Sequence, residues 1–172
     1  TRGRITMFKN KMKNLIDFSF TDFVGPEPIL REYINQASAE TKGVEFGLER
    51  SLTDNLFASL LYTRMDTRLT APDKSTDIPY IPKDKATLKL NYNPVDNLAM
   101  GINGTRVGER LSLTTQHLSS YFMLDAYLRW KLGDAVSLSV IGNNLTDEEY
   151  EEGPGVMTTN KQSVQVRVRY EM

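Results

Sequence analysis

Cysteine is absent from the 172-residue sequence, which contains one histidine and one tryptophan. The missing cysteine excludes a disulfide framework and a thiolate metal site. His117 has no cysteine with which it could form a catalytic pair. We therefore predict no catalytic residue, no bound metal and no cofactor.

A strong charge of either sign is also missing. The 21 Lys and Arg residues nearly balance the 22 Asp and Glu residues, so the net charge is -1. This balance gives no basic footprint for nucleic acid. No apolar run is long enough to span a bilayer as a helix, and no signal peptide opens the chain. Because the chain begins at Thr1, we expect a processed protein or a piece of a longer one.

Instead, apolar and polar residues alternate with a period of two in several segments of the sequence. Along 121–132 the even positions are all apolar, from Phe122 to Leu132, while the odd positions include Asp125, Arg129 and Lys131. Such alternation is typical of a β-strand with two unlike faces. The same split recurs in 43–49, 86–92, 98–103, 136–140 and 163–170.

This pattern predicts an all-β protein of about eight antiparallel meander strands. Their ranges are 3–14, 31–52, 55–68, 83–94, 97–112, 119–132, 135–146 and 160–171. Short turns (51–55, 93–97, 133–134) alternate with longer loops (17–30, 68–83, 109–120, 146–161). Consecutive hairpins then place all short turns, and both chain ends, at one end of the sheet. In 56–65 the pattern does not decide whether Leu60 and Tyr62 or Leu61 and Thr63 face outward.

The apolar face can be the core of a sandwich or soluble barrel, or it can contact lipid. Strands of about ten residues, an aromatic residue near each end of the apolar face, and the asymmetry between short turns and long loops favour a transmembrane barrel. The lipid-facing residues are then Phe122, Leu124, Leu128, Trp130, Val164, Val166, Val168 and Tyr170. The lumen-facing residues are Lys89, Asp125, Arg129, Lys131, Arg167 and Arg169.

The segment VIGNNLTDEEY, 140–150, resembles the V-x-N-L-x-D-x-x-Y pattern of TonB-dependent outer-membrane receptors. Four further segments resemble that family in order and spacing. They are ITMFKNKMKNLIDF, NQASAETKGVEFGLE, LLYTRMDTR and IPYIPKDKATLKLNYNP. Two departures are Lys9, where the family usually has tyrosine, and the ending Glu171-Met172 after Tyr170, where the family usually ends on an aromatic residue.

The resemblance implies a bacterial outer-membrane protein that takes part in active uptake of a scarce nutrient. Residues 1–172 would be a single segment, the last eight or so strands of a 22-stranded barrel, without the plug domain and its TonB-contacting segment. The implied ligand is a small metal chelate, most often a ferric siderophore and less often cobalamin. The implied partners are the remaining barrel and plug, TonB through that plug, and outer-membrane lipid and lipopolysaccharide.

Ligand contacts are expected on the long loops, where the candidates are Tyr80, Arg106, Arg110 and His117. Each of them has loop packing or lipopolysaccharide contact as a simpler role. The acidic run 147–152 could attract a divalent cation, but its spacing matches no calcium loop and favours a solvated loop. We interpret Asn143 and Asn144 as residues that end a strand and satisfy turn backbone.

Two alternative hypotheses are also compatible with the sequence. One is a self-closed eight-stranded barrel that acts as an anchor, which predicts pairing between 3–13 and 163–170. The other is a soluble β-domain that binds a partner through its loops.

Overall fold

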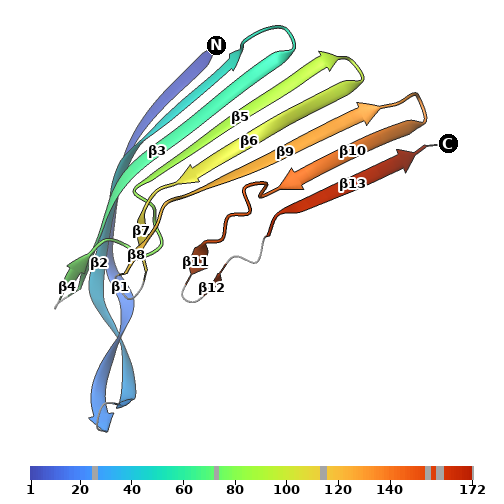
Figure 1. The fold of residues 1–172 in the computed structure, drawn as a ribbon. Helices are drawn as coiled ribbons and strands as arrows, with labels where there is room; N and C mark the ends of the chain where they lie inside the picture. Colours follow the sequence, from blue (N-terminus) through green and yellow to red (C-terminus); the bar gives the residue numbers. More distant parts are fainter. Residues whose placement is uncertain (25–26, 72–73, 113–115, 154–155, 158–160, 172) are drawn as a thin grey trace.

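The computed structural model of the protein describes residues 1–24, 27–71, 74–112, 116–153, 156–157 and 161–171. One antiparallel sheet dominates it (Figure 1). Its strands are β1 (Arg2–Val24), β2 (Glu27–Ser51), β3 (Leu56–Ala71), β5 (Asp84–Val95), β6 (Leu98–Val107), β9 (Tyr121–Lys131), β10 (Val136–Asn143) and β13 (Ser163–Tyr170), in that spatial order. The short strand β4 (Lys74–Thr76) pairs with the end of β3. The all-β meander predicted from the sequence is confirmed.

The sheet is open at both edges. Within the described part of the chain, β1 pairs only with β2 and β13 pairs only with β10. The self-closed barrel required pairing between 3–13 and 163–170, so that alternative is wrong for this structure. The described residues include no helix that could cross a membrane. Both chain ends lie at the same end of the strands as the short turns, as Figure 1 shows.

Strand register assigns each side chain to a face, because directly paired residues share one. Leu60 pairs with Leu88, and Tyr62 pairs with both Phe46 and Ala86. Leu60 and Tyr62 therefore lie on the apolar face, which resolves the ambiguity in 56–65. The neighbouring Leu61 pairs with Thr87 on the polar face.

The first hairpin is longer than the sequence predicted. The range 17–30 was expected to be a loop, but β1 and β2 stay paired backbone to backbone until Val24 meets Glu27. Antiparallel pairing requires no contrast between the two faces, so the hydrogen-bonded ladder can continue where the sequence shows no period of two.

The other long loops hold short hairpins. Strands β7 (Arg110–Leu111) and β8 (His117–Leu118) pair in one loop, and β11 (Glu151–Gly153) and β12 (Val156–Met157) pair in another. β6 and β10 end at Val107 and Asn143, earlier than the sequence predicted, and β10 ends where Asn144 takes a left-handed φ of 45°.

No second layer covers the sheet in the part of the chain that the structure describes. The buried hydrophobic residues there are limited to Ala37, Ala39, Val107 and Tyr150. Meanwhile the apolar face leaves large side chains exposed, including Met7 at 79%, Val168 at 67% and Tyr170 at 66%. A single sheet therefore presents a broad apolar surface that a soluble protein would cover.

Candidate functional site

The polar face carries a group of four cations at the short-turn end. We call Arg129, Lys131, Arg167 and Arg169 the basic patch. Ser139 pairs with Arg129 on one side and with Arg167 on the other, while Ser137 pairs in the same way with Lys131 and Arg169. Because neighbouring strands lie about 4.8 Å apart, the Cα atoms of the two basic residues on either side of each serine are roughly 10 Å apart.

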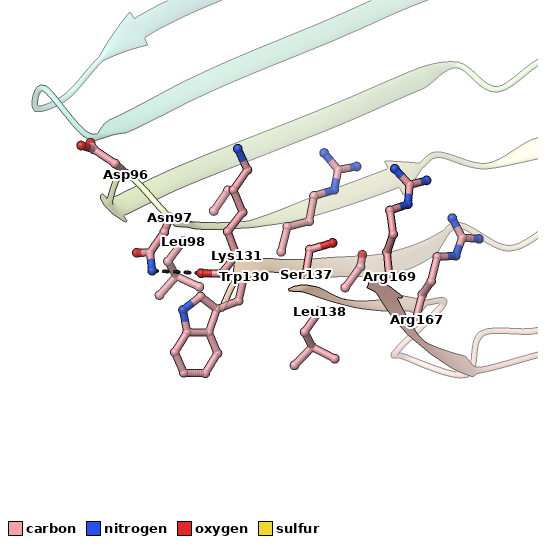
Figure 2. Close-up of a pocket in the computed structure, with 12 residues that line it drawn as sticks. Asp96, Asn97, Leu98, Trp130, Lys131, Ser137, Leu138, Arg167 and Arg169 are labelled. Atoms are coloured by element: carbon pink, nitrogen blue, oxygen red, sulfur yellow. Dashed lines mark hydrogen bonds between the residues drawn. The ribbon is translucent and has the colours of Figure 1, made fainter. Parts of the chain in front are cut away.

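The basic patch lines a hollow of about 370 Å³, and Asp96 and Asn97 line it as well. Figure 2 shows Lys131, Arg167 and Arg169 on one side of the sheet, and Trp130 and Leu138 on the other. The Arg129 guanidinium lies 5.1 Å from the centre of the Tyr127 ring. The exposed Glu171 carboxylate lies 3.6 Å from the Arg169 guanidinium. Four basic groups so arranged produce a positive field at this end of the polar face.

Asp125 anchors the motif that follows β10. One of its carboxylate oxygens accepts a hydrogen bond of 2.9 Å from the backbone N–H of Asn144, and the other accepts one of 3.3 Å from the side chain of Asn103. Asn144 is 4% exposed and has a φ of 45°, a left-handed conformation that asparagine tolerates better than most residues.

The Asn144 amide then closes the turn. Its oxygen accepts the backbone N–H of Glu148 at 3.0 Å, and its nitrogen donates to the Glu148 carbonyl at 2.9 Å. The turn role inferred for Asn144 from the sequence is confirmed.

Arg110 joins two of the long loops. It is 6% exposed, and its guanidinium donates to the carbonyl oxygens of Glu151 at 2.6 Å and Ser119 at 3.3 Å. The same guanidinium lies 4.9 Å from the centre of the Tyr121 ring, which stacks on Tyr150 at 3.9 Å.

A third loop reaches this cluster through Tyr80, whose hydroxyl donates to the Glu151 carboxylate at 2.9 Å. We call Tyr80, Arg110, Tyr121, Tyr150 and Glu151 the loop cluster.

The four predicted ligand contacts fall in different places. Tyr80 and Arg110 belong to the loop cluster, where Arg110 is buried. Arg106 pairs with Phe122 on the apolar face and forms an ion pair with Asp84. His117 is exposed on β8. The structure thus brings Tyr80 and Arg110 together and separates Arg106 from them.

Sequence reasoning did not identify Tyr121 as a partner of Arg110. The available signal was the tyrosine that ends the V-x-N-L-x-D-x-x-Y pattern, since Tyr150 is the residue that stacks on Tyr121. Within the described ranges, no group of three or more His, Cys, Asp or Glu side chains is placed to hold a metal ion.

Comparisons with known proteins connect this geometry to a family. The family described as "TonB dependent receptor-like, beta-barrel" matches residues 1–145. The probable TonB-dependent siderophore receptor PiuA of Acinetobacter baumannii is 30% identical over 134 residues, which cover 69% of this chain and 18% of that protein.

Solved structures show the same fold. The crystal structure of PiuA superposes with a TM-score of 0.74 at 24% identity, covering 98% of this chain and 26% of that one. The ferripyoverdine receptor of the Pseudomonas aeruginosa outer membrane gives 0.73 at 18% identity, covering 98% and 24%. The copper transporter OprC gives 0.71 at 17% identity, covering 98% and 28%.

The chain thus spans about a quarter of the length of these solved receptors, and its open sheet is part of a larger barrel. Relatives of this kind are outer-membrane proteins of Gram-negative bacteria, so this chain is assigned to the bacterial outer membrane. On this evidence the chain belongs to the TonB-dependent receptor β-barrel family.

Proposed function

We propose that the chain forms the C-terminal portion of a receptor barrel that imports a ferric siderophore. The observation that carries this proposal is the uncovered single sheet, whose exposed apolar face suits lipid while its other face is charged. An outer-membrane barrel has this arrangement, with an apolar outer band and a polar interior. The names of the relatives support the ligand class, since PiuA is described as a siderophore receptor.

The two faces then take distinct roles. Lys89 and Asp125 face the lumen with the basic patch, where we propose that the patch meets the plug domain through which TonB acts. The lipid-facing set is Phe122, Leu124, Leu128, Trp130, Val164, Val166, Val168 and Tyr170. Trp130 and Tyr170 lie near the short turns, where amphipathic aromatic rings suit the membrane interface.

The proposal is tested by uptake in cells that express the complete receptor containing this chain. Cells that lack their own siderophore receptors should accumulate radioactive iron supplied as ferric siderophores, and deletion of TonB should abolish this uptake. Uptake that persists without TonB would contradict the proposal. If the cells take up a copper complex but no ferric siderophore, the role as a TonB-dependent receptor stands, and the ligand is a copper complex instead of a ferric siderophore.

His117 provides the ligand-contact test, since its side chain is exposed among the long loops. Replacing His117 with alanine should raise the half-saturating chelate concentration about threefold and leave the maximal rate unchanged. The matched control is Thr53→Ala, an exposed change in a short turn at the opposite end. Equal half-saturation values in the two variants would exclude His117 from ligand contact.

Asp125 should hold the loop after β10 in place, because it accepts the Asn144 backbone N–H. Asp125→Ala removes the acceptor of two hydrogen bonds and should lower the free energy of unfolding of the complete barrel by about 2 kcal/mol. Urea unfolding in lipid vesicles measures this loss. The control Asp134→Ala alters an exposed turn residue and should change stability by less than about 0.5 kcal/mol. Similar losses in both variants would contradict the anchoring role.

A further inference from the structure

Basic side chains recur along the whole height of the polar face. One row of paired residues crosses the sheet near the long loops and includes Lys85 and Tyr121. Lys131 lies ten residues beyond Tyr121 on β9, a distance of about 33 Å at the rise of a strand. That length is comparable to the thickness of the hydrocarbon core of a bilayer. We call the basic residues of the polar face between these two heights the lumen cations: Arg2, Arg4, Lys85, Lys89, Arg129, Lys131, Arg167 and Arg169.

The lumen cations outnumber the acids on the same stretch of the polar face. The eight basic residues share it with three acidic ones, Glu45, Glu49 and Asp125. The Asp125 carboxylate already accepts two hydrogen bonds. Among the described residues, the one carboxylate within 4.0 Å of any lumen cation is that of Glu171, beside Arg169. All eight cations are exposed, so this face of the sheet has a positive charge that the chain itself does not neutralise.

The positive excess increases towards the short turns. The three rows nearest the long loops contain four lumen cations and all three acids. In the two rows nearest the short turns, β9, β10 and β13 carry the four cations of the basic patch and no acid. The hollow at the patch is lined by one acid, Asp96. The field of such a wall draws an anion from the long loops towards the short turns, the end that faces the periplasm in an outer-membrane barrel.

The lumen cations are spaced along the wall and do not converge on one point. Lys85 and Lys89 lie four residues apart on β5, which separates their Cα atoms by about 13 Å. In the two lowest rows, Ser137 and Ser139 each place a hydroxyl between two cations. A solute passes through a pore when its contacts are strong enough to admit it and weak enough, or numerous enough, to release it. Spaced cations and hydroxyls provide successive contacts of this kind.

Contact with the plug accounts for only part of this pattern. The proposed plug contact uses the basic patch, whereas Arg2, Arg4 and Lys89 lie at the middle height of the wall. Arg2 and Arg4 line a separate hollow of about 310 Å³ together with Glu49 and Ser59. A fixed contact at one height gives no reason for an excess of one sign over the full height of the wall. A charged solute that moves along the wall does.

We propose that the lumen cations guide a metal chelate of net negative charge from the long loops to the periplasmic end of the barrel, during the step that TonB drives. Pores that pass anions are lined by arginine and lysine side chains. Both residues donate charge-assisted hydrogen bonds to anionic oxygens. The inference rests on the proposed function and deepens it, because it specifies the charge of the imported chelate and the residues that it meets after it leaves the loops.

The test measures uptake of radioactive iron by cells whose one siderophore receptor is the complete receptor containing this chain. Iron is supplied as a ferric tris-catecholate, which is anionic because three doubly deprotonated catechols outweigh one ferric ion, or as a neutral ferric tris-hydroxamate. The parent receptor should import the anionic complex. The triple variant Arg2→Gln, Arg4→Gln and Lys89→Gln should lower the maximal rate for this complex about tenfold, because electrostatic guidance speeds encounters by at least about that factor. Its half-saturating concentration should stay within about twofold of the parent value, since the loops bind the chelate first.

The matched control removes three cations from the opposite face, with Lys42→Gln, Arg64→Gln and Arg68→Gln. These residues lie on the apolar face beyond its hydrophobic band, where Arg64 pairs with Val44 and Lys42 pairs with Asp66. The control variant should import the anionic complex within about twofold of the parent rate. Equal slowing in both variants, or no slowing in the lumen variant, would overturn the proposal.

The neutral complex separates guidance of the cargo from an effect on the plug. Where the parent receptor imports it, the lumen variant should slow it less than about twofold, because a neutral solute gains little from the positive wall. Equal slowing of the two complexes would show that the cations act on the plug, and would overturn the proposal. Import of the neutral complex alone would overturn this inference and leave siderophore import standing. Import of neither complex would also overturn it, and the separate TonB test then decides whether the proposed function fails as well.

Two further variants cover folding and shape. A heat-dependent shift in gel migration confirms that each variant is folded. If the lumen variant does not fold, Lys89→Gln alone should lower the maximal rate about twofold, and an unchanged rate would overturn the proposal. The charge-preserving variant Arg2→Lys, Arg4→Lys and Lys89→Arg should keep more than about half of the parent rate, since the field of the wall is retained. A rate as low as that of the glutamine variant would show that side-chain shape, and not charge, is responsible.

Discussion

Replacing Arg110 with alanine is expected to destabilise the complete barrel by about 3 kcal/mol. The guanidinium is buried and donates to two backbone carbonyls, those of Ser119 and Glu151. Hydrogen bonds from a charged donor are worth about 1.5–3 kcal/mol each, and water that enters the vacated space recovers part of the loss. Urea unfolding in lipid vesicles measures the change.

Two control variants separate this role from a general charge effect. Arg50→Ala removes an exposed arginine at the end of β2 and should cost less than about 0.5 kcal/mol. Arg110→Lys keeps the charge but loses the planar fork, so it should recover less than half of the stability. If Arg110→Ala and Arg50→Ala unfold at the same urea concentration, the loop cluster does not stabilise the barrel.

Loss of the Arg110 contacts should also loosen the loops that they join. Limited proteolysis of the folded barrel reports this loosening, because cleavage follows local opening. We expect cleavage within 109–120 and 146–161 to accelerate in Arg110→Ala, while cleavage at the short turns stays unchanged. Acceleration at both ends of the barrel would indicate general unfolding instead.

Replacing Gly101 with alanine is expected to cost about 2–3 kcal/mol. A Cβ atom at this position would lie 2.6 Å from the Tyr127 ring and 2.8 Å from the Leu90 carbonyl oxygen. Overpacking of a closely fitted site typically costs about 1–3 kcal/mol, and here the backbone carbonyl cannot move aside without disturbing the β5–β6 ladder. The Tyr127 hydroxyl also donates to Asn91 at 2.9 Å, which holds the ring over the glycine.

The matched control is Gly133→Ala, since a Cβ there would meet no atom within 4 Å. This variant should unfold at the urea concentration of the parent. A third close atom is the Asn91 side-chain oxygen at 2.9 Å. Combining Gly101→Ala with Tyr127→Ala removes the shortest of these three contacts, so the double variant should lose less than the sum of the single losses. Additive losses would show that Tyr127 does not press on this position.

The period of two was sufficient to predict the central strands and the division between their faces. Along 121–132 and 163–170, apolar and polar residues alternate, and adjacent side chains on a strand must point to opposite faces. Backbone pairing can continue where the sequence shows no clean alternation, so the extension of the first hairpin to Val24 and Glu27 was missed.

The ligand candidates show a second limit. Arg106 and Arg110 are both arginines near a long loop, and the sequence treats them alike. Register places Arg106 opposite Phe122 on the apolar face, whereas Arg110 is buried in the loop cluster. Contacts between loops that are far apart in sequence, such as Tyr80 with Glu151, leave no local pattern from which they could be predicted.

The sequence by itself determined that the chain is an antiparallel meander with one apolar and one charged face, because strand geometry converts alternation directly into sidedness. Only the tertiary structure decided that the sheet stays open, that Arg110 is buried, and that Lys42, Arg64 and Arg68 share the apolar face beyond its hydrophobic band. These features depend on which residues pair across strands, and pairing register is a property of the assembled sheet.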